Sequence, residues 1–170
     1  MIWLYYLAFL GLILGALLAF FVKEELTPGK KYFEWLKKVV LVIIIIMLIW
    51  FSFQLTISYL IAFAAGILIA WVFKKYYLYF GLALFGSFLL GNDMVYYALI
   101  ALIFIVGFPI GTLIASKFLN EKKKLVKTLL LDLFLFSVPL LFLIYNKVGD
   151  LSNVLMIFGA GALLYSLFKK

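Results

Sequence analysis

The sequence predicts an all-α, polytopic integral membrane protein with seven transmembrane helices, and three observations support this fold class. Of the 170 residues, 69% are hydrophobic and 13% are charged, and the mean hydropathy is +1.27. The apolar residues form long blocks, and a helix of about 20 such residues crosses a bilayer. The lysines stand in short clusters between these blocks. Soluble domains have a very different composition, so we expect a helix bundle in a membrane.

Each apolar block predicts one crossing. In chain order, the predicted crossings are residues 2–22, 34–51, 54–73, 76–91, 94–116, 125–145 and 151–168. No lysine precedes Lys23, so the first block lacks the basic start of a cleaved signal peptide and is expected to remain as a helix. Thr27 is expected to cap the second helix, with Pro28 in its first turn.

Short polar residues are expected to cap the last three helices, because their side chains accept hydrogen bonds from free backbone amides. Asn92 or Asp93 is the expected cap of the fifth helix. Asn120 and Asp150 are the expected caps of the sixth and seventh helices.

The lysines decide whether the short fourth block, residues 76–91, crosses the membrane. If it does, every lysine except Lys147 lies on one side. If it does not, the lysines divide almost evenly, and the usual excess of positive charge in cytoplasmic loops is lost. The predicted topology therefore has the N-terminus outside and the C-terminus inside. The tryptophans support this topology, because Trp prefers membrane interfaces. Trp3 and Trp50 lie at outer ends of the predicted crossings, and Trp35 and Trp71 lie at inner ends.

Two sequence patterns recur and indicate an internal duplication. The small residues Gly11, Gly15 and Ala19 recur 96 positions later as Gly107, Gly111 and Ala115. The segments Phe63–Gly66 and Phe73–Lys75 recur 95 positions later as Phe158–Gly161 and Phe168–Lys170. We expect three-helix units at residues 1–75 and 92–170, joined by a linker helix at 76–91, within one membrane domain. With one helix between them, the two copies enter the membrane in the same sense, which gives a parallel 3+1+3 repeat. This layout is similar to that of the sugar-transporting SWEET family, whose motifs are absent here.

Composition excludes most enzyme chemistry. The chain has no His and no Cys, and all its basic residues are lysines, so imidazole bases, thiolate nucleophiles and soft-metal ligands are missing. We expect no catalytic residue, metal or cofactor. The net charge of +8 is expected to face anionic lipid headgroups rather than nucleic acid, chiefly through Lys117, Lys122, Lys123, Lys124 and Lys127. The scarcity of Cys and Gln favours a heat-adapted source. We expect a prokaryotic protein that is integral to the cell membrane.

Small residues at every fourth position predict close helix contacts, because lipid gives helices no hydrophobic drive to associate. The predicted packing residues are Gly11, Gly15, Ala19, Ala62, Gly66, Ala70, Gly107, Gly111 and Ala115. Fixed packing is one interpretation, and a sliding or rocking interface is the other.

Asp132 is the most informative polar residue, because a carboxylate at the centre of a membrane costs about 2.5–3.5 kcal/mol and is usually paired or turned inward. Thr128 and Pro139 share its helix face, and Pro139 frees a backbone carbonyl oxygen. A polar pocket open to the cytoplasm is one interpretation. Neutralisation by a lysine such as Lys124, without a ligand, is the other. Pro109 is expected to kink the fifth helix, as a hinge or as a packing feature.

The segments Val106–Ala115, Thr128–Leu133 and Asn153–Met156 resemble the opening three helices of the membrane glycerol-3-phosphate acyltransferases. The resemblance implies seven crossings and an outer N-terminus. That family's Ser-Gly-Asn phosphate loop, its His and its Gly-Gly-Lys-Gly turn have no counterpart here, so the resemblance implies at most a non-catalytic relative.

The leading functional hypothesis is a non-enzymatic transporter or channel for a small solute. Its pathway is expected between the two three-helix units, with Asp132 near the inner end. One alternative is a membrane scaffold or complex subunit, and another is a protein that handles lipids or lipid precursors at the cytoplasmic leaflet. Expected partners are the bilayer, anionic headgroups, and a second copy of the chain or another membrane protein.

Overall fold

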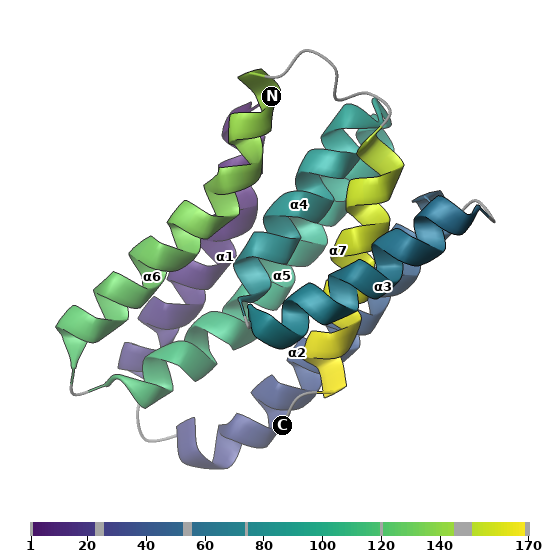
Figure 1. Cartoon of the computed structure of the whole chain (residues 1–170). Helices are drawn as coiled ribbons and strands as arrows, with labels where there is room; N and C mark the ends of the chain where they lie inside the picture. Colours follow the sequence, from purple (N-terminus) through teal and green to yellow (C-terminus); the bar gives the residue numbers. More distant parts are fainter. Residues whose placement is uncertain are drawn as a thin grey trace. The chain divides into compact units, whose positions relative to one another are not determined.

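The computed structural model describes residues 2–22, 26–52, 56–73, 75–119, 121–144 and 151–168, and within these ranges every regular element is a helix (Figure 1). The elements are α1 (Ile2–Phe21), α2 (Leu26–Ser52), α3 (Ile57–Val72), α4 (Tyr76–Leu89), α5 (Asp93–Lys117), α6 (Lys122–Ser137), the 3-10 helix η1 (Val138–Ile144) and α7 (Ser152–Phe168). The prediction of an all-α fold with seven α-helices is confirmed for these residues.

Three of the helices are long and apolar enough to cross a membrane, judged by length and composition. They are α1, α2 and α5, whose most hydrophobic stretches of 18 residues have mean hydropathies of 2.3, 2.3 and 2.6. The helices α3, α4 and α7 are apolar but shorter. All four tryptophans are exposed, with exposed fractions of 64% or more, as expected of side chains that contact lipid headgroups.

Two helix ends differ from the sequence-based expectation, and a third agrees with it. The helix α2 begins at Leu26, so Thr27 lies inside its first turn rather than at its cap. The sixth predicted crossing is α-helical only to Ser137 and continues as η1, because Pro139 has no amide hydrogen to donate to the α-helical ladder. The predicted cap of α5 is confirmed at Asn92, whose Oδ1 accepts a hydrogen bond from Val95 N at 3.3 Å.

The end of α4 also follows from its residues. Gly91 follows the helix with a φ of +69°, a conformation that glycine adopts without the steric cost paid by other residues. The expected caps Asn120 and Asp150, and the outer lysine Lys147, lie outside the described residues.

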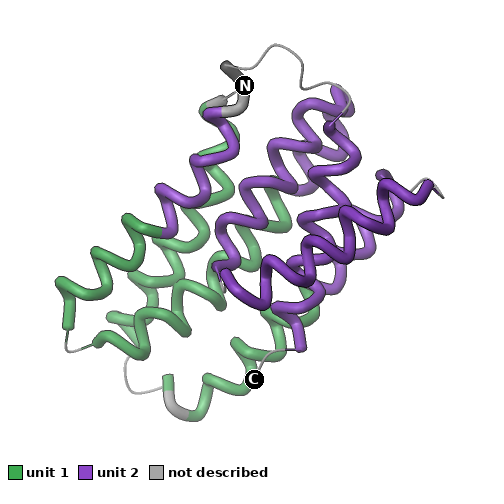
Figure 2. Tube along the Cα trace, in the orientation of Figure 1, with its two compact units in different colours: residues 1–40, 100–131 green, residues 41–99, 132–170 purple. Residues whose placement is uncertain are grey.

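The chain forms two compact units, coloured separately in Figure 2. Unit 1 consists of Met1–Val40 and Ile100–Leu131, and unit 2 of Leu41–Leu99 and Asp132–Lys170. Each unit therefore combines segments from both halves of the sequence.

In unit 1, α1 and α5 pack backbone against backbone. A Cβ atom added at Gly15 would overlap the carbonyl oxygen of Phe108 and lie 2.7 Å from its Cα, and one added at Gly11 would overlap the carbonyl oxygen of Phe104. Because the partner numbers rise together, the two helices run parallel. The Thr112 hydroxyl strengthens the contact by donating a hydrogen bond to the carbonyl oxygen of Gly15 at 3.0 Å.

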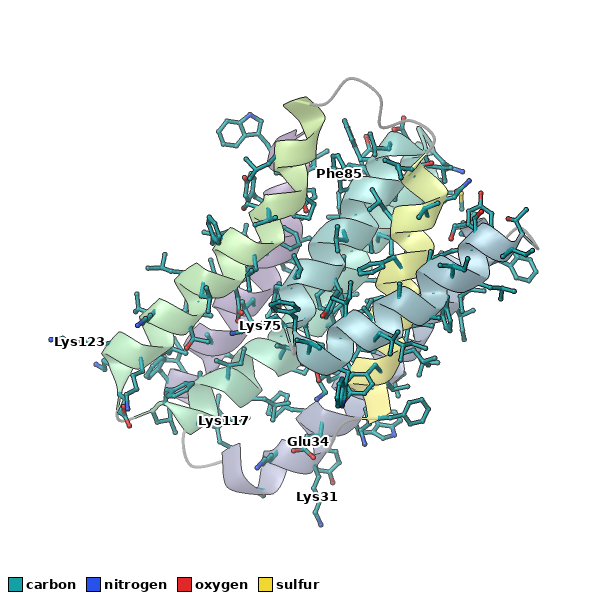
Figure 3. The ribbon with its side chains drawn as sticks, viewed as in Figure 1. Lys31, Glu34, Lys75, Phe85, Lys117 and Lys123 are labelled. Atoms are coloured by element: carbon teal, nitrogen blue, oxygen red, sulfur yellow. The ribbon has the colours of Figure 1, made fainter. Side chains whose placement is uncertain are left out.

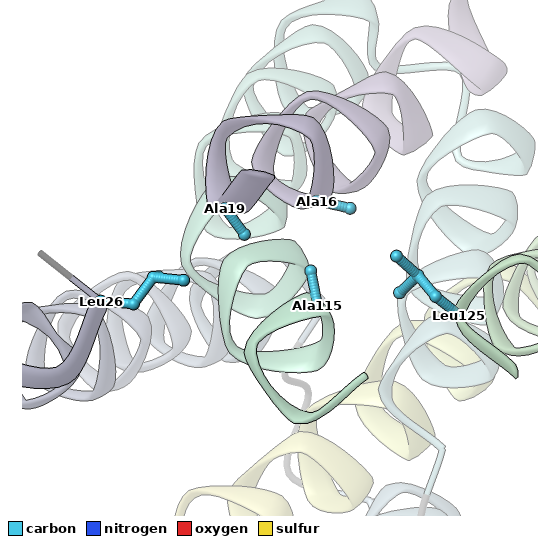
Figure 4. Close-up of a cluster of buried hydrophobic side chains, with 5 residues drawn as sticks. All are labelled: Ala16, Ala19, Leu26, Ala115 and Leu125. Carbon is cyan, nitrogen blue, oxygen red and sulfur yellow. The ribbon is translucent and has the colours of Figure 1, made fainter. Parts of the chain in front are cut away.

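The ends of four helices meet in an apolar cluster of unit 1, drawn in Figure 4. Its buried side chains are Ala16, Ala19, Leu26, Ala115 and Leu125. Partly buried side chains, among them Phe33 and Phe118, pack against it. The cluster therefore anchors the start of α2 and of α6 to the ends of α1 and α5.

In unit 2, α7 packs against both α3 and α4. A Cβ atom added at Gly66 would overlap the carbonyl oxygen of Phe158. On α4, Gly86 lies against Ser152 at the start of α7, and the Tyr76 hydroxyl reaches the other end of α7. The helices α4 and α7 are therefore antiparallel.

Candidate functional site

An ion pair joins α6 to the turn between α3 and α4 in unit 2. Lys75 Nζ lies 3.4 Å from Asp132 Oδ1, and Figure 3 labels Lys75 at this position. The Asp132 side chain is 6% exposed, whereas the Lys75 side chain is 37% exposed. Burial alone would strongly disfavour the carboxylate, so the ammonium group is the feature that makes a charged Asp132 tolerable there.

Hydrogen bonds fix the turn that carries Lys75. The Lys75 amide donates to the carbonyl oxygen of Phe73 at 2.9 Å, and the Tyr79 hydroxyl donates to the same oxygen. The Tyr76 hydroxyl donates to the carbonyl oxygen of Ser166 at 3.2 Å, which ties the turn to α7. The backbone of Lys75 is thus positioned by two neighbouring helices.

An aromatic cluster centred on Tyr77 lies near the carboxylate. Tyr77 is fully buried and lies within electrostatic range of Asp132. Its ring makes edge contacts with Phe80 and Phe136, at centroid distances of 5.6 Å and 6.2 Å. Apolar surroundings of this kind strengthen the attraction between the two charges by excluding water.

The two interpretations of Asp132 can now be compared with its contacts. Lys124, the lysine named as a possible neutralising partner, forms its ion pair with Glu121 on the surface, while Lys75 pairs with Asp132. Thr128 donates its hydroxyl to the Lys124 carbonyl oxygen of the same helix at 2.9 Å. The neutralising lysine therefore comes from a distant part of the sequence.

The two candidate prolines lie in different units. Pro139 is buried in η1, within unit 2, as is Asp132. Pro109 is buried in unit 1, where α5 continues through it as a single helix. The structure thus associates Asp132 with Lys75 and Tyr77, two residues that the sequence did not single out.

The other predicted sets are placed as follows. The nine predicted packing residues are all buried. The lysines predicted to face headgroups are exposed at the end of α5 and over the first two turns of α6, at Lys117, Lys122, Lys123, Lys124 and Lys127. In the described part of the chain, no group of three or more acidic side chains is placed to hold a metal ion.

The chemistry available at this site is electrostatic. The carboxylate and the ammonium group can each release the other and bind a solute group of opposite charge, and the carboxylate can also accept a proton.

No family model, no curated protein and no solved structure matches this chain, so the resemblance to the acyltransferases stays a prediction.

Proposed function

We propose that this protein is a seven-crossing membrane protein, with its N-terminus outside and its C-terminus inside, that carries a small polar solute past the Lys75–Asp132 pair. The proposal depends mainly on one observation. A buried carboxylate is paired with a half-exposed lysine within an apolar helical unit. Such residues are costly in a membrane and usually mark an ion or substrate pathway.

Helix lengths support a location of this pair below the membrane surface. With 16 and 14 residues, α3 and α4 span roughly 24 and 21 Å, less than the hydrocarbon thickness of about 30 Å. The turn that carries Lys75 therefore stops short of the inner surface when the outer ends of both helices lie at the outer surface. Asp132 lies about 15 Å along α6 from Lys122, at about 1.5 Å per residue, which also places it below the inner surface when Lys122 lies at that surface.

Because α3 and α4 are short, we expect a depression on the inner side at the turn that joins them. Water that fills it would reach the exposed part of Lys75, while Asp132 stays behind the ammonium group. A solute that carries charge or hydrogen-bonding groups could then replace one partner of the ion pair. The Lys75–Asp132 pair is thus the inner solute-binding site of the proposed pathway.

The glycine contacts support the parallel repeat as part of this proposal. In unit 1, Gly15 faces the carbonyl oxygen of Phe108, and Gly111 faces that of Leu12. Gly15 and Gly111 are equivalent in the proposed repeat, and so are Leu12 and Phe108. Equivalent residues therefore exchange places across the contact, as they do in a two-fold symmetric pair.

The same exchange occurs in unit 2. Gly66 faces the carbonyl oxygen of Phe158, and Gly161 faces that of Phe63. A parallel repeat related by an axis along the membrane normal has this property, and transporters with such repeats form their pathway around the axis.

Flux through reconstituted liposomes tests the function. We would measure uptake of protons, alkali cations, amino acids and sugars by the wild type, by Asp132→Asn, and by Glu121→Gln as a matched control that breaks the surface ion pair with Lys124. We expect solute-specific flux that Asp132→Asn abolishes and Glu121→Gln retains. Equal flux in both variants would remove Asp132 from the pathway, and no flux above that of empty liposomes would favour a scaffold.

Access to the turn tests the proposed depression separately. The chain has no Cys, so a single Lys75→Cys variant can be labelled without background. We expect a membrane-impermeant maleimide to label it from the inner side, more slowly than Lys123→Cys. Labelling from the outer side, or no labelling at all, would contradict the proposed entrance.

A further inference from the structure

One lysine of α2 lies on the face of that helix that is otherwise apolar and turned inward. Buried or packed residues recur along this face at helical spacing, at Leu26, Phe33, Val40 and Ile44. Lys37 falls on the same face, one turn after Phe33, and is half-buried. The other lysines of this helix, Lys30, Lys31 and Lys38, are exposed. A charge at Lys37 therefore replaces the apolar residue that this position would be expected to hold.

A second lysine approaches Lys37 from another helix. Lys117, at the end of α5, lies within electrostatic range of Lys37, as do Lys38 and the carboxylate of Glu34. Figure 3 labels Lys117 and Glu34 at this end of unit 1. The ammonium groups of Lys37 and Lys117 repel each other, and part of this positive charge is on the inward face.

The approach of these lysines is built into the fold. Ala115 precedes Lys117 by two residues, and its side chain lies in the apolar cluster of Figure 4 together with Leu26 of α2. Phe33, one turn before Lys37, packs against the same cluster. The backbones that carry Lys37 and Lys117 are therefore held together by packing, against the repulsion between their charges.

We propose that Lys37 and Lys117, assisted by Lys38, bind the phosphate group of an anionic phospholipid. A phosphate offers several oxygen acceptors and a full negative charge, so it can bridge two ammonium groups and remove their repulsion. The neighbouring side chains favour a lipid as the source, because Tyr32 and Trp35 on the same segment are 77% and 65% exposed and aromatic residues of this kind lie at headgroup level. This site lies in unit 1 and is independent of the proposed solute pathway.

Lipid binding counted by native mass spectrometry tests the site. The full chain in detergent would be titrated with phosphatidylglycerol or phosphatidylcholine. The variant Lys37→Gln/Lys117→Gln would be compared with Lys30→Gln/Lys31→Gln, which removes the same charge from exposed positions of α2. We expect one tightly bound phosphatidylglycerol in the wild type and in the control. In the first variant we expect binding to be roughly tenfold weaker or more, as for the loss of a charge-assisted hydrogen bond.

Two further measurements keep the outcome decisive. The variant Lys37→Arg/Lys117→Arg keeps both charges and should retain binding, and equal thermal unfolding of all variants excludes misfolding as the cause of a loss. Equal losses in the Lys37/Lys117 and Lys30/Lys31 variants would overturn the proposal in favour of diffuse surface charge. Inorganic phosphate is the second probe, and the lipid proposal is overturned if millimolar phosphate displaces phosphatidylglycerol completely.

Discussion

Substituting alanine for Gly15 should destabilise the protein by forcing α1 and α5 apart. The added Cβ atom would overlap the carbonyl oxygen of Phe108 and lie 2.7 Å from its Cα, whereas ordinary contacts begin at 3.4 Å. Both obstructing atoms belong to the backbone of a packed helix, so no side-chain rotation can relieve the overlap. The helices must separate by up to about 1 Å, which weakens every contact along the interface.

The magnitude is best measured against a second glycine. Gly29 lies in the first turns of α2, and a Cβ atom there would meet only the Phe33 side chain, at 3.5 Å. Both Gly→Ala changes bring a similar gain in helix propensity, about 0.5–1 kcal/mol. Only Gly15→Ala adds the cost of overpacking, about 1–3 kcal/mol. The free energies of unfolding of the two variants should therefore differ by about 1–3 kcal/mol, with Gly15→Ala the less stable.

Unfolding in a detergent titration, followed by far-UV circular dichroism, measures this difference. Gly111→Ala should behave like Gly15→Ala, because its Cβ atom would lie 2.8 Å from the Ala16 amide nitrogen. Gly159→Ala should be intermediate, since its closest obstruction is the Ala83 Cβ atom at 3.3 Å. If Gly15→Ala proves as stable as Gly29→Ala, the close backbone contact is refuted.

Three further predictions use the same unfolding assay. Lys75→Met should lower the free energy of unfolding by about 1–3 kcal/mol, because it leaves a buried carboxylate unpaired. Asp132→Asn should lower it less, since the half-exposed Lys75 can turn to water. A larger cost for Asp132→Asn would contradict this interpretation of the pair. Thr112→Val should cost about 0.6 kcal/mol, which is typical of a hydrogen bond between membrane helices. Thr128→Val should cost almost nothing, because the Thr128 hydroxyl bonds within its own helix, α6. Equal costs would show that the bond to Gly15 contributes nothing. Asn92→Ala should cost about 1 kcal/mol and speed hydrogen exchange at the Val95 amide, and unchanged exchange would argue against the cap.

Local signals were sufficient to predict the helices. Long apolar blocks bounded by lysines and by short polar residues predict the helices within a few residues, except for the end of α6 at Ser137. Asn92 was identified as a cap because its side chain acts on an amide three residues away. Pro139 was noticed as an interruption because it cannot donate to the α-helical ladder, but the local sequence did not indicate that the chain continues as a 3-10 helix after Ser137.

The candidate site shows what local patterns cannot supply. Asp132 stood out because a carboxylate inside an apolar block is unusual, yet nothing near it in the sequence indicates Lys75, which lies 57 residues away. The packing of α7 against α3 and α4 positions that lysine, and packing of this kind is a tertiary property. Lys37 is an intermediate case, because the helical periodicity of α2 alone places it on the apolar face, whereas its approach to Lys117 requires the fold.

The number of crossings is the claim on which the proposed pathway depends most directly, and single cysteines in this Cys-free chain can measure it. Lys30→Cys, Met94→Cys and Lys123→Cys occupy exposed positions before α3, after α4 and at the start of α6. A membrane-impermeant maleimide should label Met94→Cys from outside the cell, and the other two only in inverted vesicles. Three helices, α2, α3 and α4, lie between Lys30 and Met94. Labelling of Met94→Cys and Lys30→Cys from the same side would mean that an even number of them crosses, and would contradict both the topology and the inner entrance at Lys75.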